Sequence, residues 1–171
     1  MGTLTVDNLN LKGSGSVSSL GRILQIVQTS KTDTFSTTST SFTDVTGFSA
    51  TITPSSTSSK VLVMVSSNSS TSGGNNAIMK LVRGSTDVFV GDDDGASREE
   101  ATAQTRVNDT NAALTLTFNF LDSPSTTSAT TYKLQYKVQA GTGTINMTQA
   151  DSNSATLART ASSIILVEVR G

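Results

Sequence analysis

Hydroxyl groups are the most abundant reactive side chains in this sequence, because about a third of its 171 residues are Ser or Thr. A hydroxyl nucleophile needs a neighbouring base that takes its proton, and histidine is the usual one. The chain contains no His, and it also contains no Cys that could act as a nucleophile itself. A Ser–Lys pair would need a buried lysine, and nothing in the pattern indicates one. We therefore expect no catalytic residues and no enzyme activity.

The densest group of carboxylates is Asp92-Asp93-Asp94-Gly95, which Arg98-Glu99-Glu100 follows. A glycosidase needs two carboxylates at a defined separation on either side of a sugar, and adjacent residues of one turn do not give that geometry. A calcium loop spaces its carboxylates at alternate positions, whereas these are consecutive. We interpret the segment as a solvated loop tip. Asp92, Asp93 and Asp94 are kept as weak candidate metal ligands, and no cofactor is expected.

Charge and aromatic content argue against several classes of partner. The net charge is −1 and the Lys and Arg residues are scattered singly, so the basic surface that nucleic-acid binding requires is missing. The apolar runs are too short to span a bilayer, and the first residues do not resemble a secretory signal. Tyr132 and Tyr136 could stack on a sugar, but the pattern predicts that both face the core. We expect neither nucleic acid nor a membrane as a partner.

Alternating polarity predicts that the chain is built of β-strands. Residues 114–120 and 132–138 carry an apolar or aromatic side chain at every even position and a polar one at every odd position. Residues 97–106 could form one helical turn or a long loop, and Gly47 is expected to interrupt a strand. The predicted strands lie near residues 22–29, 42–53, 60–67, 76–83, 86–90, 112–121, 131–140, 143–148 and 162–169. This spacing predicts an all-β fold, an antiparallel, jelly-roll-like β-sandwich over residues 22–171.

Three of these segments, residues 23–27, 61–65 and 164–167, are apolar on both faces. A two-layer sandwich needs only one apolar face per sheet, so another surface must cover the second face. In a jelly roll of the tumour-necrosis-factor type, the first, third and last strands are neighbours in an inner sheet that packs around a threefold axis. Alternatively, Ser/Thr-rich loops or the N-terminal segment cover this face. The residues predicted for the inner sheet or trimer interface are Ile23, Ile26, Val61, Val63, Val65, Ile164 and Leu166.

The N-terminal residues form a separate unit in this interpretation. Leu4, Val6, Leu9 and Leu11 alternate with polar residues, and a Gly/Ser-rich stretch with the composition of a flexible linker follows them. We predict that residues 1–21 are an attachment arm and linker whose apolar side chains contact a neighbouring protein. The alternative is a frayed terminus or an edge strand.

Four segments of the sequence carry a recognisable pattern: QTSKTDTFS at 28–36, SFTDVTG at 41–47, TITPSSTSSKVLV at 51–63 and SSIILVEV at 162–169. These segments resemble a family of phage virion proteins that is common in marine and cyanobacterial phages. The opening TLTVDNL at residues 3–9 is similar to the start of phage fibre and head-appendage proteins. The resemblance implies a trimeric, jelly-roll-like β-sandwich with an N-terminal attachment segment and no catalytic residues.

Taken together, these features predict a bacteriophage virion structural protein on the particle surface, made in the host cytoplasm. We expect a homotrimer that decorates or cements the capsid and binds other virion proteins through its arm. A head location is favoured over the tail because a short arm and one compact domain leave no shaft. The first alternative is a tail fibre or receptor-binding protein that contacts a host surface glycan. An alternative of another class is a cell-surface carbohydrate-binding module, which would need an exposed aromatic platform.

Overall fold

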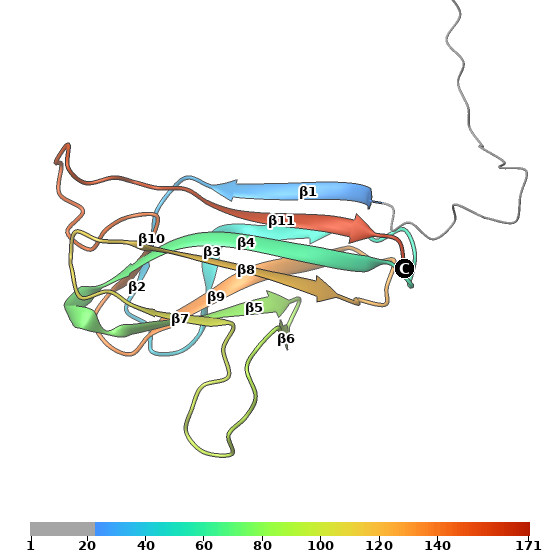
Figure 1. Ribbon diagram of the computed structural model, residues 1–171, viewed down its shortest axis with the longest axis horizontal. Coiled ribbons are helices and arrows are strands. Elements are labelled where there is room, and N and C mark those ends of the chain that lie inside the picture. Colours follow the sequence, from blue (N-terminus) through green and yellow to red (C-terminus); the bar gives the residue numbers. More distant parts are fainter. Residues whose placement is uncertain (1–22) are drawn as a thin grey trace, which may run out of the picture.

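The computed structural model describes residues 23–171, and almost all of its regular elements are strands (Figure 1). One 3₁₀ turn, η1 (Ser72–Gly74), is the only helical element in that range, and no helix there is long and apolar enough to cross a membrane. The strands are β1 (Ile23–Lys31), β2 (Phe35–Thr37), β3 (Thr43–Ile52), β4 (Lys60–Thr71), β5 (Asn76–Arg83), β6 (Thr86–Val88), β7 (Ala103–Arg106), β8 (Leu114–Asp122), β9 (Thr130–Val138), β10 (Gly143–Ile145) and β11 (Ser162–Val169).

The strands form two antiparallel sheets. Sheet A has the order β1-β11-β4-β8, and the short strands β10 and β2 continue it beside the far end of β4. Sheet B has the order β3-β9-β5, and β6 and β7 both pair with the outer edge of β5. The predicted antiparallel, jelly-roll-like β-sandwich is therefore confirmed. The prediction that strands β1, β4 and β11 are neighbours in one sheet is also confirmed, since β11 lies between the other two.

Three local predictions differ from the structure. Residues 103–106 form strand β7 rather than a helical turn or loop, because they pair with the free edge of β5. Strand β2 was not predicted, since it has only three residues and depends on β10 for its hydrogen bonds. Strand β4 continues to Thr71 although its second half is polar. In all three cases pairing with a distant strand decides the conformation, and the local sequence does not reveal that partner.

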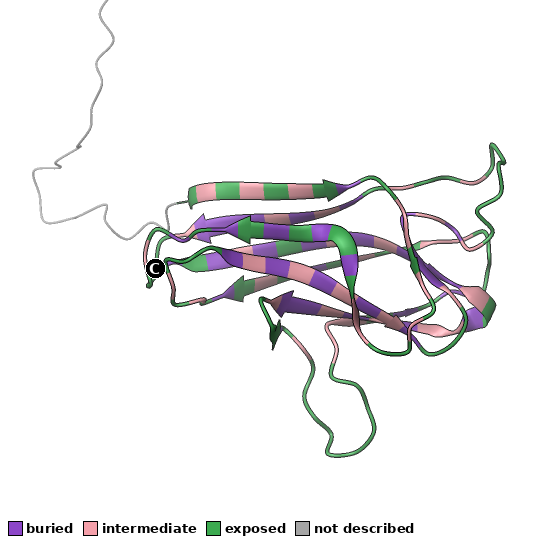
Figure 2. Cartoon of the chain, turned by 180° about the vertical axis from the view of Figure 1, so that it is seen from behind, coloured by how far each residue is buried: buried purple, intermediate pink, exposed green. Residues whose placement is uncertain are grey.

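The core lies between the two sheets, and buried and exposed residues alternate along the strands (Figure 2). Val61, Val63 and Val65 of β4 point into it, as do Tyr132 and Tyr136 of β9. The core positions predicted for the two tyrosines are thus confirmed, because both are fully buried. Met79 and aromatic side chains complete a single continuous cluster of buried residues.

At the far end of β4, hydroxyl groups replace apolar side chains in the interior. Ser69 Oγ lies 2.9 Å from the hydroxyl oxygen of Tyr136, which joins the two sheets. The hydroxyl of Ser70 donates to the carbonyl of Ala112 over 2.7 Å, and Thr71 Oγ1 accepts from the amide of Val107 over 3.1 Å. Burial raises the pKa of Tyr136 to about 12, so this phenol stays neutral. Hydrogen bonding of this kind lets a Ser/Thr-rich strand occupy the interior.

Gly47 interrupts β3 as predicted. The register with β9 shifts between Asp44 and Ser49, and Gly47 has a φ of +72°, a conformation that favours glycine. The ammonium group of Lys31, which is only 2% exposed, donates to the carbonyl of Thr46 over 2.8 Å. The side chain of this lysine therefore joins the end of β1 in sheet A to the bulge in sheet B.

Two carboxylates close the apolar core at its other end. Glu168 of β11 and Asp122 of β8 both lie opposite Val61 of β4 in the register. Asp122 accepts two hydrogen bonds from Arg83, at 2.8 and 2.7 Å, and one from the hydroxyl of Tyr132 at 2.6 Å. Arg83 and Tyr132 belong to sheet B, so this cluster joins the sheets where the apolar side chains end.

Glu168 joins sheet A to the loop that follows β3. Its Oε1 accepts hydrogen bonds from the backbone amide and the hydroxyl of Ser55, each over 2.7 Å, and its Oε2 accepts one from Gln25 over 2.7 Å. Burial alone would raise the pKa of Glu168, but these hydrogen bonds to the charged form outweigh it and hold the pKa at about 2.

The Glu168 carboxylate should make the stability of the fold depend on pH. Because its folded pKa is about 2 against an ordinary value of 4.5, its contribution is complete above about pH 5 and decreases as the pH falls through 4.5 toward 2. We expect Glu168→Gln to melt below the wild type at neutral pH, with the difference shrinking in acid. Thermal melts across this range test it, with the exposed Glu100→Gln as control. Parallel curves for wild type and Glu168→Gln would contradict the assignment.

Removal of the Asp122 carboxylate should destabilise the sandwich strongly. The variant Asp122→Ala leaves Arg83 and the Tyr132 hydroxyl without their acceptor, which costs about 3 kcal/mol when a largely buried pair is broken. The matched control is Asp87→Ala, which breaks the more exposed pair with Lys80 and should cost no more than about 1 kcal/mol. Urea unfolding of both variants measures the difference, and equal losses would show that Asp122 has no special role.

Candidate assembly face

The outer face of sheet A carries a continuous apolar surface that crosses all four long strands. Ile26, Val167, Leu62 and Leu121 lie directly opposite one another in β1, β11, β4 and β8. Their side chains point away from the core, because their neighbours at the alternate positions are the ones that fill it. Ile165 and Met64 continue the surface in the next outward row. We call the six residues Ile26, Leu62, Met64, Leu121, Ile165 and Val167 the outer stripe.

Much of the outer stripe is open to solvent. Ile26 is 61% exposed, Leu121 50% and Met64 37%, although such side chains are usually buried, whereas Val167 between its neighbours is only 8% exposed. Ile23 and Leu24, at the start of β1, are exposed as well. Burial of one such side chain contributes about 1.5–3 kcal/mol, so a partner that covered several of them would be bound favourably. A contiguous apolar patch on a folded surface marks an interaction site.

The structure divides the residues predicted for the inner sheet or trimer interface between two surfaces. Val61, Val63, Val65, Ile164 and Leu166 lie in the core, while Ile23 and Ile26 are exposed. The even positions of β4 and the odd positions of β11 form the outer surface, and these were not singled out from the sequence. Leu121 was missed too, although an apolar residue directly after the alternating run 114–120 breaks the alternation and could have revealed it.

The outer face of sheet B is charged instead. Lys80 pairs with Asp87 and Lys133 with Asp44, each over 2.7 Å, and the Lys133 hydrogen bond is the main reason that the pKa of Asp44 is lowered. Lys80 also lies 4.6 Å from the centre of the Phe42 ring. Such pairs suit contact with water, so sheet B needs no further cover. The two outer faces of the sandwich therefore differ, and within residues 23–171 that of sheet A leaves several large apolar side chains exposed.

The acidic segment forms part of an exposed loop rather than a site. Asp93 accepts a hydrogen bond from the amide of Gly95, and Asp94 accepts one from Ala96 and pairs with Arg98 at 3.4 Å. These contacts satisfy the loop's own backbone. Within residues 23–171, no group of three or more His, Cys, Asp or Glu side chains could hold a metal ion.

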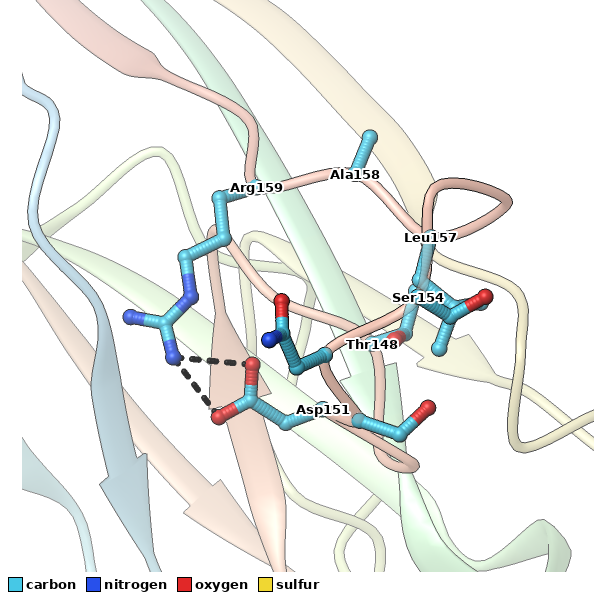
Figure 3. A pocket seen from close by; sticks show the side chains of 8 residues that line it. Thr148, Asp151, Ser154, Leu157, Ala158 and Arg159 are labelled. Carbon is cyan, nitrogen blue, oxygen red and sulfur yellow. Dashed lines mark hydrogen bonds and ion pairs between the residues drawn. The ribbon is translucent and has the colours of Figure 1, made fainter.

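A polar cleft of about 240 Å³ lies in the loop between β10 and β11 (Figure 3). Arg159 donates to both carboxylate oxygens of Asp151, at 2.9 and 2.7 Å, and this pair braces the loop. Thr148, Ser154 and Leu157 also line the cleft, and none of its lining residues is aromatic. The cleft therefore lacks the stacking surface that the carbohydrate-binding alternative needs.

The predicted arm contacts, Leu4, Val6, Leu9 and Leu11, lie outside the described residues.

Comparisons with known proteins give only distant structural similarity. No family model and no curated protein matches the sequence. Among solved structures, the T13 viral particle of infectious bursal disease virus (IBDV) has 14% identity and a TM-score of 0.45, and covers 97% of this chain and 42% of that chain. The VP2 subviral particle of the same virus has 16% identity and a TM-score of 0.34, with 97% and 44% covered. The chain thus spans less than half the length of either, and similarity at this level does not transfer a function.

Because Ile26 lies on the outer face of sheet A and Leu166 on its core face, a charge at these two positions should affect stability very differently. Ile26→Glu should change the free energy of unfolding by no more than about 0.5 kcal/mol, because the side chain is exposed. Leu166→Glu should prevent folding, because it places an unpaired charge in the core. Circular dichroism and urea unfolding, at a concentration where light scattering detects single copies, provide the measurement. A folded, stable Leu166→Glu variant would show that the faces are reversed.

Proposed function

We propose that this chain is a bacteriophage virion structural protein that decorates or cements the capsid as a homotrimer, without catalytic activity. The outer stripe is the observation that carries this proposal. A sheet with one face in the core and an apolar second face is suited to permanent assembly, since interfaces between obligate partners are themselves apolar.

Two further features support the proposal. Strands β1, β11 and β4 are neighbours in sheet A, as expected for a tumour-necrosis-factor-type jelly roll, in which the outer face of this sheet packs around a threefold axis. The sequence resemblance to phage virion proteins covers residues 28–36, 41–47, 51–63 and 162–169. These segments include the end of β1, the start of β4 and all of β11, which belong to the proposed interface sheet, and parts of β3 in sheet B.

Residues 1–21 are proposed as the attachment to other virion proteins. Their apolar side chains alternate along the chain, so an extended segment could add a strand to a neighbouring sheet and bury one row of side chains. In this arrangement the sandwich supplies the trimer and the N-terminal segment supplies the contact with the particle. The two roles can be separated by truncation.

Deletion of residues 1–15 should abolish binding to the particle and leave the trimer intact. The deletion removes Leu4, Val6, Leu9 and Leu11 but no residue of the sandwich. Light scattering of the purified protein measures the trimer, and co-sedimentation with particles that lack this protein measures binding. The matched control carries Thr3→Ala and Thr5→Ala, which keep the apolar side chains.

The outcomes separate the parts of this proposal. Full occupancy by the truncated protein would show that the arm is not the anchor, and a monomeric full-length chain at micromolar concentration would overturn the trimer. Labelling of intact virions with an antibody against the sandwich distinguishes head from tail. Label confined to the tail would replace capsid decoration by the fibre or receptor-binding alternative.

A further inference from the structure

A second apolar patch lies at the side of the sandwich, around Phe89. The ring of Phe89 is 44% exposed and stacks on Phe120, with 5.2 Å between the ring centres and 21° between the planes. Phe118 lies at 6.3 Å from the same ring. Phe89 follows β6 of sheet B, whereas Phe118 and Phe120 belong to β8 at the edge of sheet A. The patch therefore lies where the two sheets meet, beyond the β8 end of the outer stripe.

The surroundings of the two apolar patches carry opposite charge. Asp92, Asp93 and Asp94 follow Phe89 closely and are all exposed, and Asp94 pairs with Arg98. Beside the outer stripe, Lys60 occupies the outward position of β4 next to Leu62 and is exposed. The other outward positions of β4, β8 and β11 carry no charged residue, and neither do those of β1 from Ile26 to its end. Lys60 is therefore the only charge on this part of the outer face. Exposed Arg170 follows β11 at the same end of the sheet. The Phe89 patch is thus bordered by acidic side chains, and the stripe by basic ones.

The outer stripe and the Phe89 patch together limit how copies of this chain can pack on one another. If the outer stripe packed on the outer stripe of a second copy, the contact would be twofold and would close a dimer, with Phe89 still exposed. If one patch packs on the other, each copy uses both, and the contact can close into a ring. Only the second arrangement covers both patches and also brings the acidic border against the basic one.

We propose that, within the homotrimer proposed above, Phe89 and residues 92–94 of one copy pack against the outer stripe beside Lys60 of the next copy. The aromatic ring supplies the apolar contact with Ile26, Leu62 and Leu121, and the aspartates face Lys60. The contact repeats three times around the ring. Its charged border lies in water, so it steers the register and the rate of association and is weakened by salt.

Cysteine cross-linking tests this contact directly, because the natural chain has no Cys. Met64→Cys places a thiol in the outer stripe and Asp92→Cys places one beside Phe89, both at exposed positions. With a short bismaleimide, the double variant should give covalent dimers and trimers on a denaturing gel. Neither single variant should do so. The control, Thr51→Cys with Asp92→Cys, uses the outer face of sheet B and should also give none.

Each other result has a definite meaning. Covalent dimers from Met64→Cys alone would show a stripe-to-stripe contact and overturn the inference. A double variant that is trimeric by light scattering but does not cross-link would overturn this contact and leave the trimer standing. Single copies of the wild type in light scattering would remove the trimer, and with it this contact.

A charge exchange gives a second test that does not depend on cross-linking distance. Lys60→Glu and Asp93→Lys should each weaken association several-fold at low salt, since each places like charges across the contact. The two substitutions in one chain should restore association, because every contact then contains the reversed pair. No restoration in the double variant would contradict the pairing of these borders.

Discussion

Part of sheet A is apolar on both of its faces, and sheet B covers only one of them. This constraint follows from the run of apolar residues at the start of β4, where odd and even positions alike carry aliphatic side chains. Strand β11 beside it repeats the pattern at residues 164–167, whereas β8 on the other side adds only Leu121 to the outer face. A single copy of the domain therefore leaves apolar side chains of sheet A exposed to water. The proposed assembly would bury these side chains and so complete the packing of the sheet.

Polar side chains set the limits of the apolar interior at both ends. At one end, the carboxyl groups of Glu168 and Asp122 flank Val61 and bind groups from loops and from sheet B. At the other end, neutral hydroxyls of β4 bind Tyr136 and backbone carbonyls. The chain has no Cys, so no disulfide holds the sheets together. Paired buried polar groups instead fix the registration of the two sheets, because each would be costly to leave without its partner.

The sequence pattern was enough to predict the sandwich, the Gly47 bulge and the adjacency of β1, β4 and β11. Period-2 alternation is a local property, and burial on both sides identifies a strand inside a sheet. The division of those strands into core and outer residues was not predictable, since an all-apolar run looks the same from either face. Strands β2 and β7 also escaped prediction, because they exist only through pairing with β10 and β5. No alternation of polar and apolar residues marks Phe89 in the sequence, and its ring meets that of Phe120 only in the folded structure.

The position of β11 between β1 and β4 has a consequence for synthesis. The ribosome makes β1 and β4 long before β11, so sheet A cannot close until residues 162–169 have emerged. Until then the chain contains β1 and β4 but lacks β11, the strand that lies between them. Pairing between strands so far apart in the sequence is slow. Ile165 and Val167, which complete the outer stripe, arrive with the same strand. The surface proposed for assembly therefore becomes available only when the fold is complete, and a prematurely terminated chain would be excluded from the oligomer.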